Sequence, residues 1–293
     1  MYKKNGIAYL FIIPMLIFLV IFLIYPFAIN IYNSFFRYTS ILDRNPVFTG
    51  FNNYKELITS RQFGIAIGNT FLLMVLVIIF QVGIALVLAL LVNQITKFSS
   101  FYKISFFIPI IISATALGLM FQMFYKTDGG LFNQILSIFK IKPVTWFDLN
   151  NGKKFLYVMM MPVIWQYIGF YFVIFLTGLT TISNEMIEAS KIDGASELQT
   201  TFKIKIPLIQ NVTRVVIVLA ITGTLKVFDL PYILNPIANP NGETYLLGTY
   251  MYNIAFFRNK NLGLAASFAV IMAVLGVGLS GVVNKIFKQN KDI

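Results

Sequence analysis

The side chains that could do chemistry in this chain of 293 residues are neutral hydroxyls, amides and aromatic rings within long apolar stretches. Hydrocarbon penalises polar groups unless they face protein or water, so such groups mark candidate binding positions. The chain contains no histidine and no cysteine. Thiol nucleophiles, disulfides, thiolate or imidazole metal sites and histidine acid–base catalysis are therefore excluded. We predict no catalytic residue and no metal site.

Two apolar stretches, residues 155–180 and 215–237, carry most of these polar groups. A sugar needs flat apolar surfaces to stack on and neutral partners for its hydroxyls, and this mixture offers both. Packing between helices, with local backbone hydrogen bonds from threonine, is the competing interpretation for each residue. The predicted substrate-pathway residues are Trp165, Tyr167, Tyr171, Thr222, Thr224, Lys226 and Asp229.

Lys226 and Asp229 are the charged residues within the second of these stretches. Their spacing of three places them on one face of a helix, where they would neutralise each other. This pattern predicts a structural ion pair, with contact to substrate as the alternative. A lysine free of the aspartate would instead suit a substrate that bears a phosphate or a carboxylate.

The composition places these stretches in a membrane. The chain is 58% hydrophobic and 12% charged, whereas a soluble domain carries about twice that charged fraction. The net charge of +12 is spread over the ends of the apolar stretches, which favours anchoring at a membrane surface over binding of nucleic acid. No Walker-type phosphate loop occurs, so we do not expect this chain to hydrolyse ATP.

Six apolar stretches reach the ~20 residues that a helix needs to cross a bilayer. The first is too long for the apolar part of a signal peptide and lacks an A-x-A-like cleavage site, so we predict an uncleaved span. Between the third and fourth, residues 131–139 have helical spacing and Trp146 follows, which is typical of an interfacial helix. The sequence predicts an all-α, polytopic single domain over residues 1–293, with spans at about 7–30, 69–92, 104–125, 155–180, 215–237 and 261–284.

Residues 185–207 form the longest charged interval between these spans. Asn184 is a plausible N-cap for a short helix, and Gly194 can adopt the left-handed conformation that ends it. Ser196 and Gln199 read as a capping box that opens a second short helix. Pro207 disfavours helix at the residue before it, so the second helix should stop or bend there.

The interval also contains a spaced motif. Glu188-Ala189-Ser190 is followed after three residues by Gly194, and after nine more by Ile204, Ile206 and Pro207. This resembles the EAA loop of the membrane subunits of ABC importers, E-A-A-x3-G-x9-I-x-L-P, with a serine and an isoleucine replacing residues of similar size. The resemblance implies that this loop couples the chain to an ATPase through Glu188, Ala189, Ser190, Asp193, Gly194, Ala195 and Pro207.

Other segments resemble the sugar-type subfamily of these permeases. The first span carries Pro14 and Pro26, residues 48–54 follow the phrase F-x-G-F-x-N-Y, and residues 106–113 follow F-x-P-x3-S. The resemblance implies a heterodimer with a second homologous permease subunit, two ATP-binding subunits and an extracellular solute-binding protein. ATP and Mg would be bound by the partner ATPase, with no cofactor in this chain.

The resemblance further implies a multi-pass protein of the bacterial cytoplasmic membrane with both termini inside and residues 185–207 cytosolic, between helices 4 and 5. Of the 23 Lys and Arg residues, eleven fall on each side of this arrangement and Lys226 lies within a span. The inner loops are shorter, so the density of positive charge favours it only weakly.

Together these patterns predict the membrane-spanning permease subunit of an ATP-driven, binding-protein-dependent importer for an oligosaccharide or other sugar. A glycerol-phosphate-type importer subunit is the alternative. An ion-coupled secondary transporter usually shows internal repeats and intramembrane acidic residues, for which only Asp229 qualifies here. A membrane-embedded enzyme is disfavoured, because the spans contain no clustered carboxylates that could act as catalytic groups.

Overall fold

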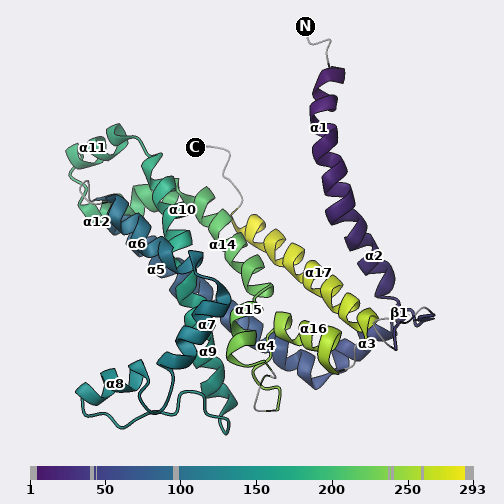
Figure 1. The fold of residues 1–293 in the computed structure, drawn as a ribbon. Coiled ribbons are helices and arrows are strands. Elements are labelled where there is room, and N and C mark those ends of the chain that lie inside the picture. Colours follow the sequence, from purple (N-terminus) through teal and green to yellow (C-terminus); the bar gives the residue numbers. More distant parts are fainter. Residues whose placement is uncertain are drawn as a thin grey trace. The chain divides into compact units, whose positions relative to one another are not determined.

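The computed structural model describes residues 5–39, 43, 45–94, 99–236, 238, 241–258 and 261–287, which are mostly helical (Figure 1). The chain divides into two compact units. One comprises Met1–Phe63 and Met251–Val274, and the other comprises Gly64–Tyr250 and Leu275–Ile293.

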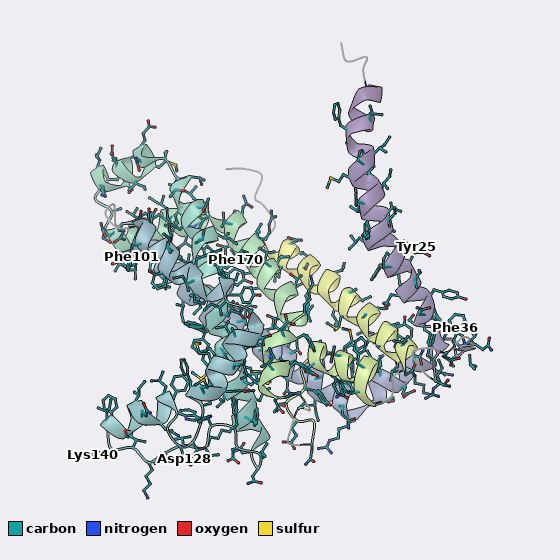
Figure 2. The ribbon with its side chains drawn as sticks, in the orientation of Figure 1. Tyr25, Phe36, Phe101, Asp128, Lys140 and Phe170 are labelled. Atoms are coloured by element: carbon teal, nitrogen blue, oxygen red, sulfur yellow. The ribbon has the colours of Figure 1, made fainter. Side chains whose placement is uncertain are left out.

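The first unit opens with one long helical stretch, made of α1 (Asn5–Leu19), a π turn η1 (Val20–Ile24) and α2 (Tyr25–Asn33). It contains the first predicted span. Every side chain from residue 10 to residue 29 is exposed, and Figure 2 shows them projecting outward from the ribbon, Tyr25 among them. An apolar helix with this exposure is suited to contact lipid or another apolar chain.

A short hairpin follows, in which β1 (Phe36–Arg37) pairs antiparallel with β2 (Val47–Phe48). The all-α prediction did not include this pairing. With two residues in each strand it is too short to leave a period-two pattern in the sequence.

The F-x-G-F-x-N-Y motif at residues 48–54 holds the C-terminal end of α2 through hydrogen bonds. In helix α3 (Asn52–Thr59), the buried Asn53 amide donates to the carbonyl oxygens of Ser34 and Phe36, each at 2.8 Å. The Tyr54 and Ser34 hydroxyls hydrogen-bond at 2.6 Å. The asparagine and the tyrosine of the phrase thus have a structural role.

In the second unit, the predicted second span lies in one long helical stretch, α4 (Arg61–Leu76), the π turn η2 (Val77–Val82) and α5 (Gly83–Asn93). The fourth corresponds to α9 (Gly152–Gln166) and α10 (Ile168–Thr180), and the fifth to α14 (Gln210–Leu225) and α15 (Asp229–Leu234). Helix α17 (Leu262–Ile286), which belongs to the first unit up to Val274 and to the second from Leu275, contains the sixth. Five helical stretches of the described chain are long and apolar enough to cross a membrane, or six if one bent pair counts as a span.

That bent pair replaces the straight third span that we expected. Helix α6 (Ser99–Ile111) and helix α7 (Ala114–Phe124) meet at an angle of 93°. Pro109 lacks the N–H that would continue the helical ladder, and Ser113 is extended, with its hydroxyl accepting from the Ala116 N–H at 3.2 Å. A serine that caps a new helix four residues after a proline accounts for the break.

The connections hold further helices. Helix α8 (Leu131–Ile138) lies where the interfacial helix was predicted, and the Trp146 indole donates to Asn133 on it at 3.1 Å. Helix α16 (Leu247–Asn253) was not predicted. Its start is held by α4, where the Thr70 hydroxyl accepts from the Leu247 N–H at 2.9 Å.

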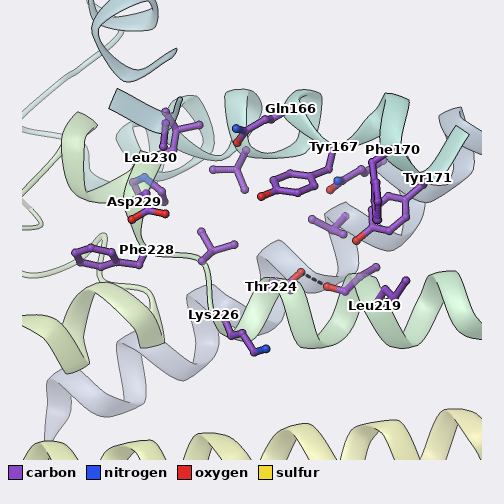
Figure 3. Close-up of a pocket in the computed structure, with 18 residues that line it drawn as sticks. Gln166, Tyr167, Phe170, Tyr171, Leu219, Thr224, Lys226, Phe228, Asp229 and Leu230 are labelled. Atoms are coloured by element: carbon purple, nitrogen blue, oxygen red, sulfur yellow. Dashed lines mark hydrogen bonds between the residues drawn. The ribbon is translucent and has the colours of Figure 1, made fainter. Parts of the chain in front are cut away.

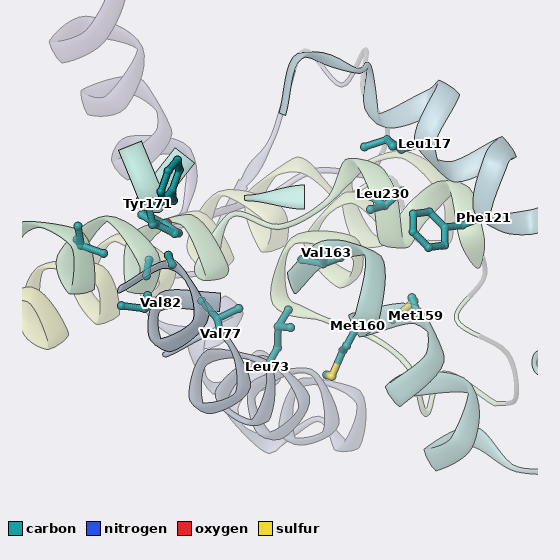
Figure 4. Packing of buried hydrophobic residues seen from close by; sticks show 14 of the residues in the cluster. Leu73, Val77, Val82, Leu117, Phe121, Met159, Met160, Val163, Tyr171 and Leu230 are labelled. Atoms are coloured by element: carbon teal, nitrogen blue, oxygen red, sulfur yellow. The ribbon is translucent and has the colours of Figure 1, made fainter. Parts of the chain in front are cut away.

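The core of the second unit forms where α10 packs against α5 and α6, and where α15 packs against α7. Ala85 and Ala89, one turn apart on α5, are fully buried, and small residues of this kind let helices approach closely. A Cβ placed on Gly169 of α10 would overlap the carbonyl oxygen of Phe106 on α6. Figure 4 shows part of this core, including Leu73, Val77, Met159, Val163 and Tyr171.

Candidate functional site

A cavity of about 340 Å³ opens in the second unit among η2, α9, α10, α14 and the start of α15 (Figure 3). Its volume falls in the range of about 300–1,000 Å³ that is usual for small-molecule sites. Aromatic and aliphatic side chains form most of the lining, with a few polar groups among them. The residues used below are Gln81, Gln166, Tyr167, Phe170, Tyr171, Gly223, Thr224, Lys226 and Asp229.

The predicted pathway residues divide into two groups. Five line the cavity: Tyr167, Tyr171, Thr224, Lys226 and Asp229. Trp165 and Thr222 do not. The Trp165 ring packs edge-on against Phe121, with centroids 5.8 Å apart, and the Thr222 hydroxyl donates to the Val218 carbonyl at 2.8 Å.

The hydroxyls at the cavity differ in what they contact. Thr224 donates to the Ala220 carbonyl of its own helix at 2.7 Å, so this hydroxyl has a backbone partner (Figure 3). The Tyr171 side chain is buried, but its hydroxyl is accessible at the cavity and forms no hydrogen bond with any residue that the structure describes. A Cβ built on Gly223 finds this hydroxyl as its nearest atom, at 4.0 Å. Gly223 therefore leaves room beside a tyrosine hydroxyl that has no protein partner.

Two glutamines supply the other buried polar groups. Gln81 is 3% exposed and Gln166 is 8% exposed, and within the described part of the chain neither amide is hydrogen-bonded. Most buried amides in proteins have partners, so a lone buried amide at a cavity indicates a group left for water or a ligand. Neither residue was among the predicted site residues.

The signal for Gln81 is present in the sequence, because apart from Asn69 at its start it is the only amide within the apolar stretch 69–92. The sequence does not show that the π turn η2 carries it into the cavity. Single π turns of this kind occur often at functional sites, but their positions follow from tertiary packing.

The predicted ion pair between Lys226 and Asp229 is wrong. Helix α14 ends at Leu225, residues 226–228 are not helical and Asp229 opens α15, so the two residues do not share a helix face. Among the described residues, the salt bridge present joins Arg37 to Glu56 at 3.3 Å. In Figure 3 the side chains of Lys226 and Asp229 point in different directions.

The helix break explains how these charges are accommodated. Lys226 lies at the C-terminus of α14, where the helix dipole favours a cation, and Asp229 lies in the first turn of α15, where it favours an anion. Both side chains are exposed, so each charge also remains accessible to water.

The coupling segment, which we define as Ser183–Ile209, begins with helix α11 (Asn184–Ile192). Its N-cap is Ser183 and not Asn184, which is already helical. The Ser183 backbone is extended and its hydroxyl accepts from the Met186 N–H at 3.4 Å. Serine and asparagine both cap helices well, so the sequence alone does not show which of Ser183 and Asn184 is the N-cap.

Gly194 ends α11 as predicted, with φ of +77°. The Ala195 N–H donates to the Ser190 carbonyl at 2.9 Å, and the Gly194 N–H donates to the Lys191 carbonyl at 3.1 Å. This pair of bonds is the Schellman motif, which requires a left-handed residue at this position. The fixed distance from Ser190 to Gly194 therefore has a local physical cause.

The second part of the segment contains α12 (Glu197–Thr200), the π turn η3 (Thr201–Lys205) and α13 (Ile206–Leu208). Ser196 and Gln199 form the predicted capping box. Of the predicted stop or bend before Pro207, the stop does not occur, because this proline is accepted at the second position of α13 and the chain leaves the helix at Ile209. The wider π turn before it bonds the Ile206 N–H to the Thr201 carbonyl.

The two helical pieces are joined by hydroxyls. Ser190 on α11 and Thr200 on α12 are both buried, and their side-chain oxygens lie 3.2 Å apart in a hydrogen bond. Glu188 and Ala189 face outward and are exposed. Large apolar side chains are exposed beside them, which is typical of an interaction surface: Met186, Ile192, Leu198 and Phe202.

Apolar helices that surround a cavity, with a segment of short capped helices between two of them, are typical of a transport permease. The family of binding-protein-dependent transport system inner membrane components matches residues 62–290, and the chain belongs to this family. It is 31% identical to the probable ABC transporter permease protein YurN of Bacillus subtilis, over 99% of both chains. It is 30% identical to the multiple sugar-binding transport system permease protein MsmF of Streptococcus mutans, over 90% of this chain and 89% of the relative.

The fold is also that of a solved structure. A chain of a bacterial ABC transporter involved in the import of the acidic polysaccharide alginate superposes with a TM-score of 0.83. It covers 99% of this chain and 98% of its own length at 23% identity, a level that shows the shared fold alone. The predicted membership of the ABC importer permeases is thus confirmed, and the chain is a permease subunit of the inner membrane, not an enzyme.

Proposed function

We propose that this chain is the membrane-spanning subunit of an ATP-driven importer that moves an oligosaccharide or another sugar through the cavity between α10 and α14. The observation that carries the proposal is a cavity lined by aromatic rings and neutral buried polar groups within membrane-spanning helices. The name of the relative MsmF, a multiple sugar-binding transport system permease, supports the same substrate class.

The coupling segment Ser183–Ile209 docks to the ATPase subunit. Its caps and its buried hydroxyl pair make it a stiff unit, and its exposed Glu188 and apolar side chains supply a surface for a partner. When the two ATPase subunits close on ATP, they move the coupling segment, and the cavity becomes accessible from the outside. ATP hydrolysis then returns the permease to its inward-facing state. ATP and Mg²⁺ are held by the partner, so this chain needs no cofactor of its own.

The family description names dependence on a binding protein, which supports the solute-binding partner. The proposed assembly contains a second homologous permease, two ATP-binding subunits and an extracellular solute-binding protein. In the proposed topology both termini and the coupling segment face the cytosol, and α6 with α7 forms the third of six spans.

Transport by the reconstituted assembly tests the proposal. Proteoliposomes with ATP inside are expected to accumulate radiolabelled maltotriose, raffinose or arabinotriose when the solute-binding protein is outside, and to lose this uptake without ATP. A glycerol-phosphate importer would instead accumulate sn-glycerol 3-phosphate. Uptake by this chain alone, driven by an ion gradient with no ATPase present, would overturn the proposal.

A further inference from the structure

We propose that Gln81 and Gln166 determine the specificity of the cavity, and that they select an uncharged polyhydroxylated unit over one carrying a carboxylate or phosphate. The inference rests on the proposed function, since it names the substrate class of the same cavity.

The two amides reach the cavity from different elements. Gln81 lies on the π turn η2 and Gln166 lies at the C-terminal end of α9. Both side chains are more than nine-tenths buried, both line the cavity, and neither is bonded to another described residue. Packing of the second unit therefore brings two unpaired amides, far apart in sequence, to one cavity.

A third neutral group completes the set. The Tyr171 side chain on α10 is buried, and the absence of a side chain at Gly223 on α14 leaves the space next to its hydroxyl open. Figure 3 shows Gln166, Tyr167 and Tyr171 along α9 and α10, with α14 across from them. Polar groups from two spans thus face the space beside the flat rings of Tyr167 and Phe170, with α14 opposite.

The chemistry of these groups favours a neutral ligand. An amide offers a donor and an acceptor together, as does each hydroxyl of a sugar, so every polar atom can be satisfied on both sides. A carboxylate or phosphate only accepts, and would leave the amide oxygens facing negative charge. An anion removed from water needs a cation or several donors in compensation.

The charged residues at the cavity do not supply that compensation. Lys226 and Asp229 line it as one cation and one anion that do not pair, and both are exposed, so water screens the lysine as a partner for an anion. The end of α14 already stabilises the lysine. The polar residues at the cavity that are more than nine-tenths buried, Gln81, Gln166, Tyr171 and Thr224, are all neutral.

Equilibrium dialysis tests the inference on the permease–ATPase complex without the solute-binding protein, so that the cavity alone selects. The probes are radiolabelled maltotriose, raffinose and arabinotriose, with trigalacturonate and sn-glycerol 3-phosphate as anions. We expect at least one neutral sugar to bind saturably and about tenfold more tightly than either anion, and Gln81→Leu and Gln166→Leu each to weaken its binding about tenfold.

Gln62→Leu is the matched control, because Gln62 lies in the same helical stretch as Gln81 but outside the cavity, and its binding is expected to equal that of the unaltered chain. Gel filtration checks assembly. If the leucine variants do not assemble, Gln81→Asn and Gln166→Asn replace them, since a shorter amide keeps the chemistry and should give an intermediate loss.

The outcomes separate this inference from the proposed function. Unchanged sugar binding in both glutamine variants, or tighter binding of an anion, overturns the inference while ATP-driven sugar uptake by the full assembly still stands. If the full assembly takes up sugar but no neutral sugar binds to the permease–ATPase complex, the inference is also overturned and the proposed function stands. Failure of both uptake and binding overturns the two together.

Discussion

The coupling segment Ser183–Ile209 and the cavity between α10 and α14 are built in opposite ways. In the segment, short-range bonds satisfy the helix ends, from the Ser183 cap to the Schellman bonds at Gly194 and the capping box at Ser196. In the cavity, the amides of Gln81 and Gln166 come from distant elements and have no partner among the described residues. Local bonds give the segment a defined surface for the proposed contact with the ATPase, whereas polar groups without protein partners leave the cavity open to the proposed ligand.

The largest expected effect comes from reversing a charge on the coupling segment. Glu188→Lys should abolish sugar-stimulated ATP hydrolysis by the assembled complex, because losing a central contact of a protein interface costs about 2–4 kcal/mol, or roughly 30- to 1,000-fold in affinity. The permease itself should fold, since Glu188 is exposed.

Co-purification of the ATPase subunit with the variant permease measures this loss directly. Asp128→Lys reverses an exposed acid on the connection before α8 and serves as the control. Retention of the ATPase by Glu188→Lys would show that this surface is not where the subunits meet.

The next effect comes from filling the cavity. Gly223→Leu should lower sugar-stimulated ATP hydrolysis about tenfold or more while leaving the unstimulated rate intact, because a large side chain would occupy the space beside Tyr171. Gly223→Ala should have little effect, since its Cβ meets nothing closer than 4.0 Å. Equal activity of the two variants would show that substrate does not use this space.

A smaller effect is expected where backbone conformation stiffens the segment. Gly194 has φ of +77°, and Gly194→Ala forces an L side chain into the left-handed region at a cost of about 1–2 kcal/mol. We expect uptake to fall several-fold, with normal insertion in the membrane.

Gly64→Ala is the control for that change, because Gly64 is helical with open space around it. Hydrogen exchange at Lys191–Ser196 should speed up in the Gly194 variant alone. Unchanged exchange there would mean that the left-handed turn does not stiffen the segment.

The smallest effect concerns the hydroxyl pair that joins α11 to α12. Ser190→Ala removes the 3.2 Å bond to Thr200 and should weaken the contact by about 1 kcal/mol, with a loss of uptake below about threefold. Thr200→Val alone and the double variant complete a double-mutant cycle. Strict additivity would show that the two hydroxyls do not act together.

The difference between the coupling segment, formed by local bonds, and the cavity, formed by distant elements, also explains how much of each the sequence predicts. The segment was predicted nearly residue by residue, because caps, a left-handed glycine and a capping box are local signals; the errors were a shift from Asn184 to Ser183 and a helix that continues through Pro207. Most spans were predicted because long apolar runs are also local. The bend between α6 and α7 was not, although Pro109 and Ser113 mark it.

The cavity could be predicted only in part. Tyr167, Tyr171 and Thr224 line it as the polar pattern of the spans suggested, but Trp165 and Thr222 point to other contacts, a matter of side-chain register that packing sets. The ion pair of Lys226 and Asp229 failed because the helix breaks between them. Gln81 was missed because a π turn, set by packing against α14, presents it.

Labelling of Leu198→Cys with a membrane-impermeant maleimide tests the central claim most directly. Leu198 lies on α12 of the coupling segment and is 71% exposed, and the chain has no native cysteine to react. The account predicts labelling in inverted membrane vesicles, protection when the ATPase subunit is added back, and no labelling in intact cells. Labelling in intact cells would contradict it, because the segment would then lie on the outer face, out of reach of any cytosolic ATPase.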